Sequence, residues 1–126
     1  MPPNFRMLGA LPHGDAMALL RCARFFVLPS YHEGLPIALL EAMAHGVPAV
    51  ASDISPHREV TGDDGIAELF PVGNVAALAD ALISMWKRSY DARVALADRA
   101  RNKVLRLYGW DAAVTTVEQI YQELDC

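Results

Sequence analysis

Short apolar runs alternate with amphipathic stretches along the first two thirds of the chain. Arg24–Leu28 and Val47–Ala51 are nearly continuous apolar runs, and Ile66–Phe70 is a similar, shorter segment. Runs too short for a helix are typical of strands covered on both faces, as in a parallel sheet. Asn4–Leu8 is expected to form a further short strand.

Helical spacing fills the intervals between these runs. One helix is predicted from about Asp15 to Cys22 and another from Pro36 to about His45, where proline suits the first helical position and Gly46 suits the exit. The polar segment Ser52–Gly65 is rich in turn formers, with about one helical turn around Pro56 to Val60.

From Asn74, a good N-cap, the chain is predicted to be helical to its end. Three successive helices carry apolar residues at steps of three and four: Val75, Leu78, Leu82, Met85 and Trp86; Leu96, Ala100, Val104 and Leu107; and Trp110, Ala113, Val114, Val117, Ile120, Tyr121 and Leu124. Trp86 and Trp110 are therefore expected in the core. Strands and helices that alternate before a helical tail predict an α/β fold with a parallel sheet.

Length and composition fit one ordinary globular domain. The chain has 126 residues, 53% of them hydrophobic and 21% charged, with no internal repeat and no linker, so we expect residues 1–126 to form a single domain. The net charge is −4 and the basic residues are scattered along the sequence. This argues against a nucleic-acid partner, which requires a concentrated positive face.

The two cysteines, Cys22 and Cys126, cannot make a disulfide framework, and no Cys/His spacing resembles a zinc site, so no metal is expected. The N-terminus lacks the features of a signal peptide, and the longest apolar stretches are too short to span a bilayer. These observations favour a cytoplasmic location, with a peripheral membrane contact left open for a full-length context.

The loop Pro29–Leu35 joins an expected strand to an expected helix. In an open α/β sheet, ligands bind outside the carboxyl ends of the strands, against the N-termini of the following helices. Free backbone N–H groups and the helix dipole favour an anion such as a diphosphate there, and Gly34 permits close backbone approach.

Two carboxylates flank this predicted anion site. Glu33 lies in the loop and Glu41 about one and a half turns into the helix. The two carboxylates would repel phosphates, but each could accept hydrogen bonds from hydroxyls. A ligand with a sugar at one end, a ribose at the other and phosphates between them would therefore satisfy the arrangement. The alternative, that Glu33 is an exposed loop residue and Glu41 an ordinary helical glutamate, is equally compatible with the residues alone.

The same segment resembles a known family. Its motifs are Glu33-Gly34-Leu35-Pro36 through Glu41-Ala42-Met43-Ala44, followed by Gly46-Val47-Pro48 and Ala51-Ser52-Asp53. They are similar to the Glu, seven residues, Glu signature of retaining group 1 (family 4) glycosyltransferases of the GT-B type. The similarity continues over nearly the whole chain, at Phe5–Pro12, Phe26–Ser30, Glu59, Asp64–Phe70, Gly73–Leu82 and Tyr108–Asp111.

This resemblance implies a Rossmann-like parallel sheet and a role for each loop residue. Glu33 would act as the catalytic-site group that contacts hydroxyls of the donor sugar, and Glu41 would hold the ribose. The amides of Gly34, Leu35 and Ile37 would lie near the sugar and diphosphate. His32 would either touch this ligand or be a polar loop residue. The implied partner is a nucleotide sugar whose group is transferred with retained anomeric configuration, without an obligatory metal or other cofactor.

The resemblance covers only the later part of the family's C-terminal, donor-binding half. Absent are the acceptor half, the first two strand–helix units of the donor half, and the family's Arg and Lys that neutralise the departing diphosphate. The chain is therefore expected to be a truncated donor domain that binds nucleotide sugar and is inactive alone. The alternative is a non-catalytic nucleotide- or protein-binding α/β module. A flavodoxin-like domain is disfavoured, because Gly9–Gly14 carries no phosphate-binding fingerprint.

The truncation also predicts an open sheet edge. In the usual strand order, the two absent strands lie between Asn4–Leu8 and Arg24–Leu28. An unpaired apolar edge favours association. We therefore expect Asn4–Leu8 to move beside Arg24–Leu28, or this edge to bind a second copy of the chain or the missing N-terminal half.

Overall fold

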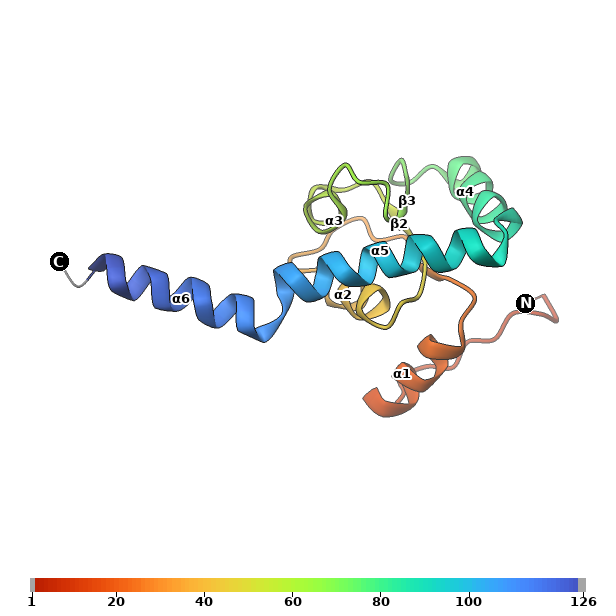
Figure 1. Cartoon of the computed structure of the whole chain (residues 1–126). Helices are drawn as coiled ribbons and strands as arrows, with labels where there is room; N and C mark the ends of the chain where they lie inside the picture. The colour runs from red at the N-terminus through yellow and green to blue at the C-terminus, as the bar shows by residue number, and fades with distance from the viewer. Residues whose placement is uncertain (1, 125–126) are drawn as a thin grey trace.

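A computed structural model describes residues 2–124, except for the side chains of Tyr121, Glu123 and Leu124. Its elements are α1 (His13–Cys22), β1 (Phe26–Leu28), α2 (Ile37–Ala44), β2 (Ala49–Ser52), α3 (Ser55–Thr61), β3 (Glu68–Phe70), α4 (Val75–Lys87), α5 (Tyr90–Tyr108) and α6 (Trp110–Leu124). The predicted α/β alternation followed by a helical tail is confirmed (Figure 1).

The three strands form one parallel sheet in the order β1-β2-β3. Val50 at the centre of β2 is the partner of Val27 on one side and of Glu68 on the other. All four residues of β2 are buried, which explains why the three residues before Ser52 are all apolar.

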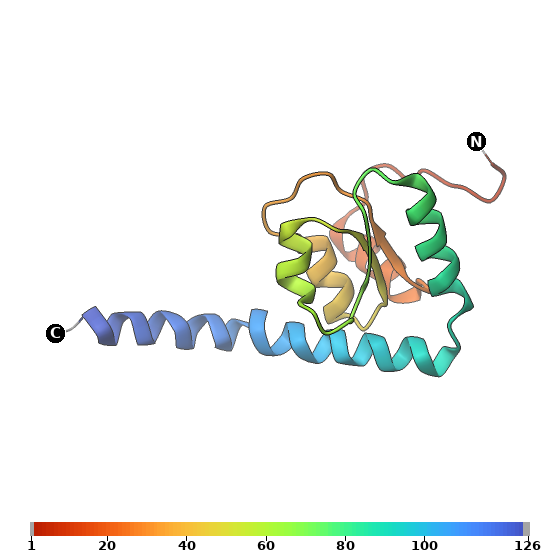
Figure 2. The same cartoon turned by 90° about the horizontal axis from the view of Figure 1, so that it is seen from above.

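Helices cover both faces of this sheet, as Figure 2 shows. Ala49 and Ala51 of β2 face a core built with Leu39 and Met43 of α2, and with residues of α3 and α5. Val50 points the other way, into a second core with residues of α4. Successive strand residues thus serve opposite layers, as the two-residue period of a strand requires.

Two predicted helix boundaries are also confirmed. Gly46 follows α2 with a φ of 70°, a conformation that glycine adopts without strain, so the chain can leave the helix and enter β2. Asn74 caps α4, because its Oδ1 accepts a hydrogen bond of 3.0 Å from the backbone N–H of Ala77.

The strand predicted over Asn4–Leu8 is wrong. This segment contains a turn, in which the N–H of Phe5 donates to the carbonyl of Pro2 at 3.0 Å, and its apolar side chains are exposed. It has not moved beside β1, which pairs only with β2 in the described part of the chain. An apolar run becomes a strand only where a neighbouring strand can satisfy its backbone groups. Association at this free edge stays a prediction.

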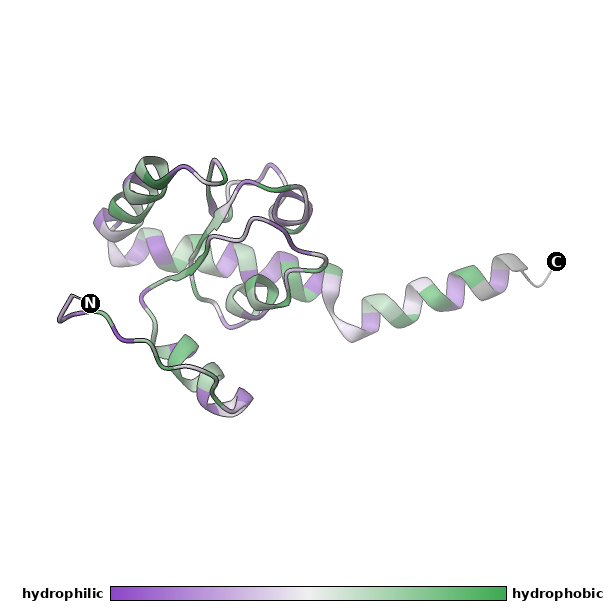
Figure 3. Ribbon diagram, turned by 180° about the vertical axis from the view of Figure 1, so that it is seen from behind, coloured by the Kyte–Doolittle hydropathy of each residue, from purple (hydrophilic) through white to green (hydrophobic). Residues whose placement is uncertain are grey.

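The buried positions predicted for Trp86 and Trp110 are wrong as well. Trp110 is 82% exposed, and Trp86 is 59% exposed with the guanidinium of Arg24 lying 4.2 Å from its ring centroid. The sequence correctly predicts α6 as an amphipathic helix, but α6 extends away from the sheet, and Val117 and Ile120 are about half exposed (Figures 1 and 3). The side chains of Tyr121 and Leu124 lie outside the described residues. Periodicity predicts a helix, whereas burial requires a partner surface.

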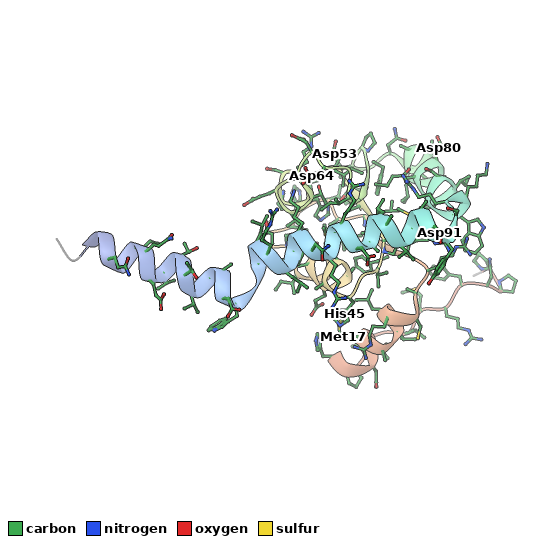
Figure 4. All side chains as sticks on the ribbon, in the orientation of Figure 1. Met17, His45, Asp53, Asp64, Asp80 and Asp91 are labelled. Atoms are coloured by element: carbon green, nitrogen blue, oxygen red, sulfur yellow. The ribbon has the colours of Figure 1, made fainter. Side chains whose placement is uncertain are left out.

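Two ion pairs flank α3, each with an aspartate marked in Figure 4. Arg58 donates to both carboxylate oxygens of Asp53, and Lys103 Nζ lies 2.6 Å from Asp64 Oδ2. The hydrogen bond from Arg58 lowers the pKa of Asp53 below its ordinary value, and the hydrogen bond from Lys103 does the same to the pKa of Asp64. Each pair favours the charged carboxylate in the folded chain.

Acid is therefore expected to destabilise the fold. A carboxyl whose pKa is lowered in the folded state stabilises that state above its unfolded pKa, about 3.9 for aspartate, and this stabilisation disappears as the pH falls through the lower folded value. The melting temperature, followed by circular dichroism, should fall between about pH 5 and about pH 3. The fall should be smaller in Asp64→Asn, and Asp80→Asn, which alters none of the described ion pairs, should follow the unsubstituted chain. An identical pH profile for Asp64→Asn would contradict the role of its ion pair.

Candidate functional site

The predicted ligand loop lies where parallel-sheet topology requires it. Residues 29–36 leave the carboxyl end of β1 and lead into α2, and the segments that follow β2 and β3 emerge at the same edge of the sheet. Tyr31 packs near Gly73, and these residues line one pocket with Asn74. The loops after β1 and β3 therefore meet at this edge.

Glu33 is half-buried and held by its own loop. The hydroxyl of Ser30 donates to Glu33 Oε1 at 2.7 Å. Oε2 has no hydrogen-bond partner among the described residues, so one carboxylate oxygen is fixed and the other is available to a ligand. A carboxylate acceptor makes the stronger, charge-assisted kind of hydrogen bond with a hydroxyl.

Ser30 is itself anchored from the neighbouring strand. The hydroxyl of Ser52, at the end of β2, donates to the Ser30 carbonyl at 2.5 Å. Behind it, His57 is fully buried and its Nδ1 lies 2.7 Å from the Ser52 carbonyl. The sequence alone leaves Ser52 as a candidate cleft or turn residue and His57 as a loop residue. The signal that points to them is the pair of serines near the carboxyl ends of neighbouring parallel strands.

The backbone N–H groups of this loop divide into two sets. Those of Gly34 and Leu35 make no hydrogen bond to the described residues, and both residues are exposed. The N–H of Ile37 donates to the carbonyl of Leu35 at 2.9 Å, so it is less available to a diphosphate than the sequence suggests. No side chain caps the start of α2. His32 is exposed beside Glu33 and makes no hydrogen bond within the described residues.

Glu41 lies on α2 with its side chain 30% exposed. His13, the first residue of α1, places Nε2 3.6 Å from Glu41 Oε1. The structure thus brings the start of α1 to the second carboxylate. Glu41 also lines a largely apolar pocket of about 210 Å³ with Ile37, Leu40, Val104, Leu105 and Tyr108.

A further pocket, of about 520 Å³, lies elsewhere. It is lined by Asp64, Ile66, Arg99, Asn102, Lys103 and Arg106, next to the segment that enters β3 and so at the opposite edge of the sheet. Its three cations show that the basic residues are less scattered in space than along the sequence. Lys103 bonds Asp64 and the Thr61 carbonyl, and Arg99 donates to the Asp64 carbonyl. These bonds fix the α3–β3 loop to α5.

Neither a metal-ligand cluster nor a membrane-spanning helix is found among the described residues. No group of three or more His, Cys, Asp or Glu residues among them could hold a metal ion. Within the same part of the chain, no helix combines the length and apolar character needed to cross a membrane.

Comparison with known proteins assigns this chain to a family. The sequence pattern of the family described as "Glycosyl transferases group 1" matches residues 1–103, and the chain belongs to this family. Its architecture is similar to that of a GT-B glycosyltransferase domain, as the resemblance of the sequence implies.

Specific relatives agree with this assignment. The chain is 32% identical over 120 residues to a phosphatidyl-myo-inositol mannosyltransferase of Mycobacterium leprae, covering 94% of this chain and 32% of the relative. It is 46% identical over 61 residues to O-antigen chain mannosyltransferase B of Escherichia coli, covering 48% of this chain and 16% of that protein. The structure of sucrose-phosphate synthase from Thermosynechococcus elongatus superposes with a TM-score of 0.82 at 28% identity, over 94% of this chain and 30% of the synthase. The chain thus spans a third or less of the length of these relatives.

Proposed function

We propose that this chain is part of the donor-binding half of a retaining glycosyltransferase and that it binds a nucleotide-diphospho-sugar at the carboxyl edge of its sheet. Family membership and the loop after β1 support the proposal. The observation that carries it is the combination, in one loop, of a hydrogen-bonded carboxylate at Glu33 with free amides at Gly34 and Leu35. Such a loop offers acceptors to sugar hydroxyls and donors to phosphates.

Each residue then has a distinct role. Glu33 accepts hydrogen bonds from hydroxyls of the donor sugar, and His32 contacts the same ligand from the neighbouring position. Gly34 and Leu35 donate their amides to the sugar and diphosphate, and Ile37 contributes the start of α2. Glu41 accepts from the ribose.

We expect the chain to bind donor without transferring its sugar. Negative charge develops on the diphosphate as the sugar leaves, and electrostatic stabilisation of such charge is usually the largest catalytic contribution. At this edge the cation of Arg58 is already paired with Asp53. The free N–H groups alone leave most of that charge uncompensated.

Calorimetric titration of the intact chain with UDP-glucose, GDP-mannose and the corresponding nucleoside diphosphates tests the proposal. At least one nucleotide sugar should bind, and the matching free diphosphate should displace it. No transfer should occur until an N-terminal portion of a homologous glycosyltransferase is added. Failure of every nucleotide sugar and diphosphate to bind would refute the proposal.

The second candidate function is a non-catalytic module that binds another protein. The exposed apolar side of α6 and the free edge of β1 favour it. Both features also suit association with the N-terminal half of a glycosyltransferase of this family or with a second copy of the chain. Nucleotide binding without any restorable transfer, together with a stable dimer or protein complex, would favour the module.

A further inference from the structure

Glu33 is the half-buried outer end of a series of hydrogen bonds that begins in the protein interior. The Ser30 hydroxyl donates to Glu33 Oε1 at 2.7 Å, and the Ser52 hydroxyl donates to the Ser30 carbonyl at 2.5 Å. Ser52 is completely buried at the end of β2. A rigid strand is thereby connected, through two serines, to a loop that is otherwise largely exposed.

His57 supports the inner end of this series. Its Nδ1 lies 2.7 Å from the Ser52 carbonyl, and a carbonyl only accepts, so Nδ1 carries the hydrogen of this bond. The ring is buried, and Nε2 has no hydrogen-bond partner among the described residues. The Thr61 hydroxyl donates to the His57 carbonyl at 2.9 Å. Both sides of Ser52, its carbonyl and its hydroxyl, are therefore held in place.

Ser30 thus acts at two points. Its carbonyl is fixed by Ser52, and its hydroxyl fixes one oxygen of Glu33, so the other oxygen keeps a defined direction. A free glutamate side chain in a loop samples many rotamers, and ordering it on ligand binding lowers affinity. Ser30 removes part of that freedom before any ligand arrives.

We propose that Ser30 and Ser52 are positioning residues that orient the unoccupied carboxylate oxygen of Glu33 toward hydroxyls of the donor sugar. This inference rests on the proposed function, because it assigns a role only if Glu33 contacts that sugar. It predicts that the serines affect recognition of the sugar and not of the nucleotide, which Glu41 and the loop amides bind.

The test compares two ligands on the same variants. The dissociation constants of the tighter-binding nucleotide sugar, UDP-glucose or GDP-mannose, and of its free nucleoside diphosphate are measured by calorimetry on the intact chain. Ser30→Ala should weaken binding of the nucleotide sugar by about fivefold to tenfold. This is the change in affinity expected for the loss of one hydrogen bond of about 1 kcal/mol or slightly more. Binding of the free diphosphate should change less than about twofold. Ser52→Ala should shift the two constants in the same pattern.

Two variants serve as controls. Ser30→Thr keeps the hydroxyl and should restore selective binding of the nucleotide sugar. Ser84→Ala removes another serine that donates to a glutamate, Glu68 Oε2 at 3.2 Å, on α4 away from the loop, and should change neither constant. A general loss of structure would weaken binding of both ligands.

The outcomes separate the two levels of the proposal. If the unsubstituted chain binds neither ligand, the proposed function is refuted and the positioning role falls with it. If the unsubstituted chain binds both ligands, and Ser30→Ala either weakens the binding of both equally or changes the binding of neither, the positioning role alone is refuted. Selective loss of the nucleotide sugar in Ser30→Ala, reversed in Ser30→Thr, supports it.

Discussion

Replacing Leu39 with alanine is expected to lower the free energy of unfolding by about 2–5 kcal/mol. Leu39 is completely buried on α2 and packs into the core formed with β2, α3 and α5. The substitution removes apolar contacts and leaves a cavity that close-packed neighbours fill only in part. Small domains have a total stability of about 5–15 kcal/mol, so the variant should melt well below the unsubstituted chain in thermal denaturation followed by circular dichroism.

Trp110→Ala is the matched control for this experiment. It removes a larger apolar side chain from a position that is 82% exposed, so the melting temperature should change little. A large drop in the melting temperature of Trp110→Ala would show that α6 is packed against other residues. An unchanged melting temperature for Leu39→Ala would show that the core differs from the one described.

Features of this fold that depend on neighbouring residues can be predicted from the sequence, whereas features that depend on contacts with distant residues cannot. Periodicity, the cap at Asn74 and the glycine at Gly46 act over a few residues, and they correctly predict most of the helices and strands. The apolar segment Asn4–Leu8 and the apolar side of α6 depend on surfaces from elsewhere. Without such a surface, the first forms no strand and the second is left exposed.

The site divides in the same way. Glu33 and Glu41 lie in the loop after β1 and in α2, as the sequence predicts, because the carboxyl end of a parallel strand is defined by the strand pattern itself. Two contacts in the site join residues far apart in the sequence. His13 contacts Glu41, 28 positions later, and Ser30 contacts Ser52, 22 positions later. Only the path of the chain and the register of β1 against β2 determine these contacts. Sequence spacing therefore predicts where the candidate loop lies, but not what holds its side chains.

Replacing Glu41 with alanine is expected to weaken binding of the nucleoside diphosphate by roughly tenfold to one hundredfold. Hydrogen bonds to charged groups contribute about 1.5–3 kcal/mol, and each 1.4 kcal/mol corresponds to a factor of ten. The fold should persist, because Glu41 is partly exposed and its contact with His13 is a surface contact of small energy. Calorimetric titration measures the affinity, and circular dichroism verifies the fold. Glu118→Ala, at an exposed position of α6, is the control and should bind like the unsubstituted chain.

The ribose role has a sharper signature than the loss of affinity. If Glu41 accepts hydrogen bonds from ribose hydroxyls, the unsubstituted chain should bind a nucleoside diphosphate more tightly than its 2′-deoxy or 3′-deoxy counterpart, because the carboxylate then loses a charge-assisted bond. Glu41→Ala has no acceptor to lose, so it should bind the ribose and deoxyribose forms about equally. A variant that still discriminates between them would assign the ribose to another residue, even if its overall affinity had fallen.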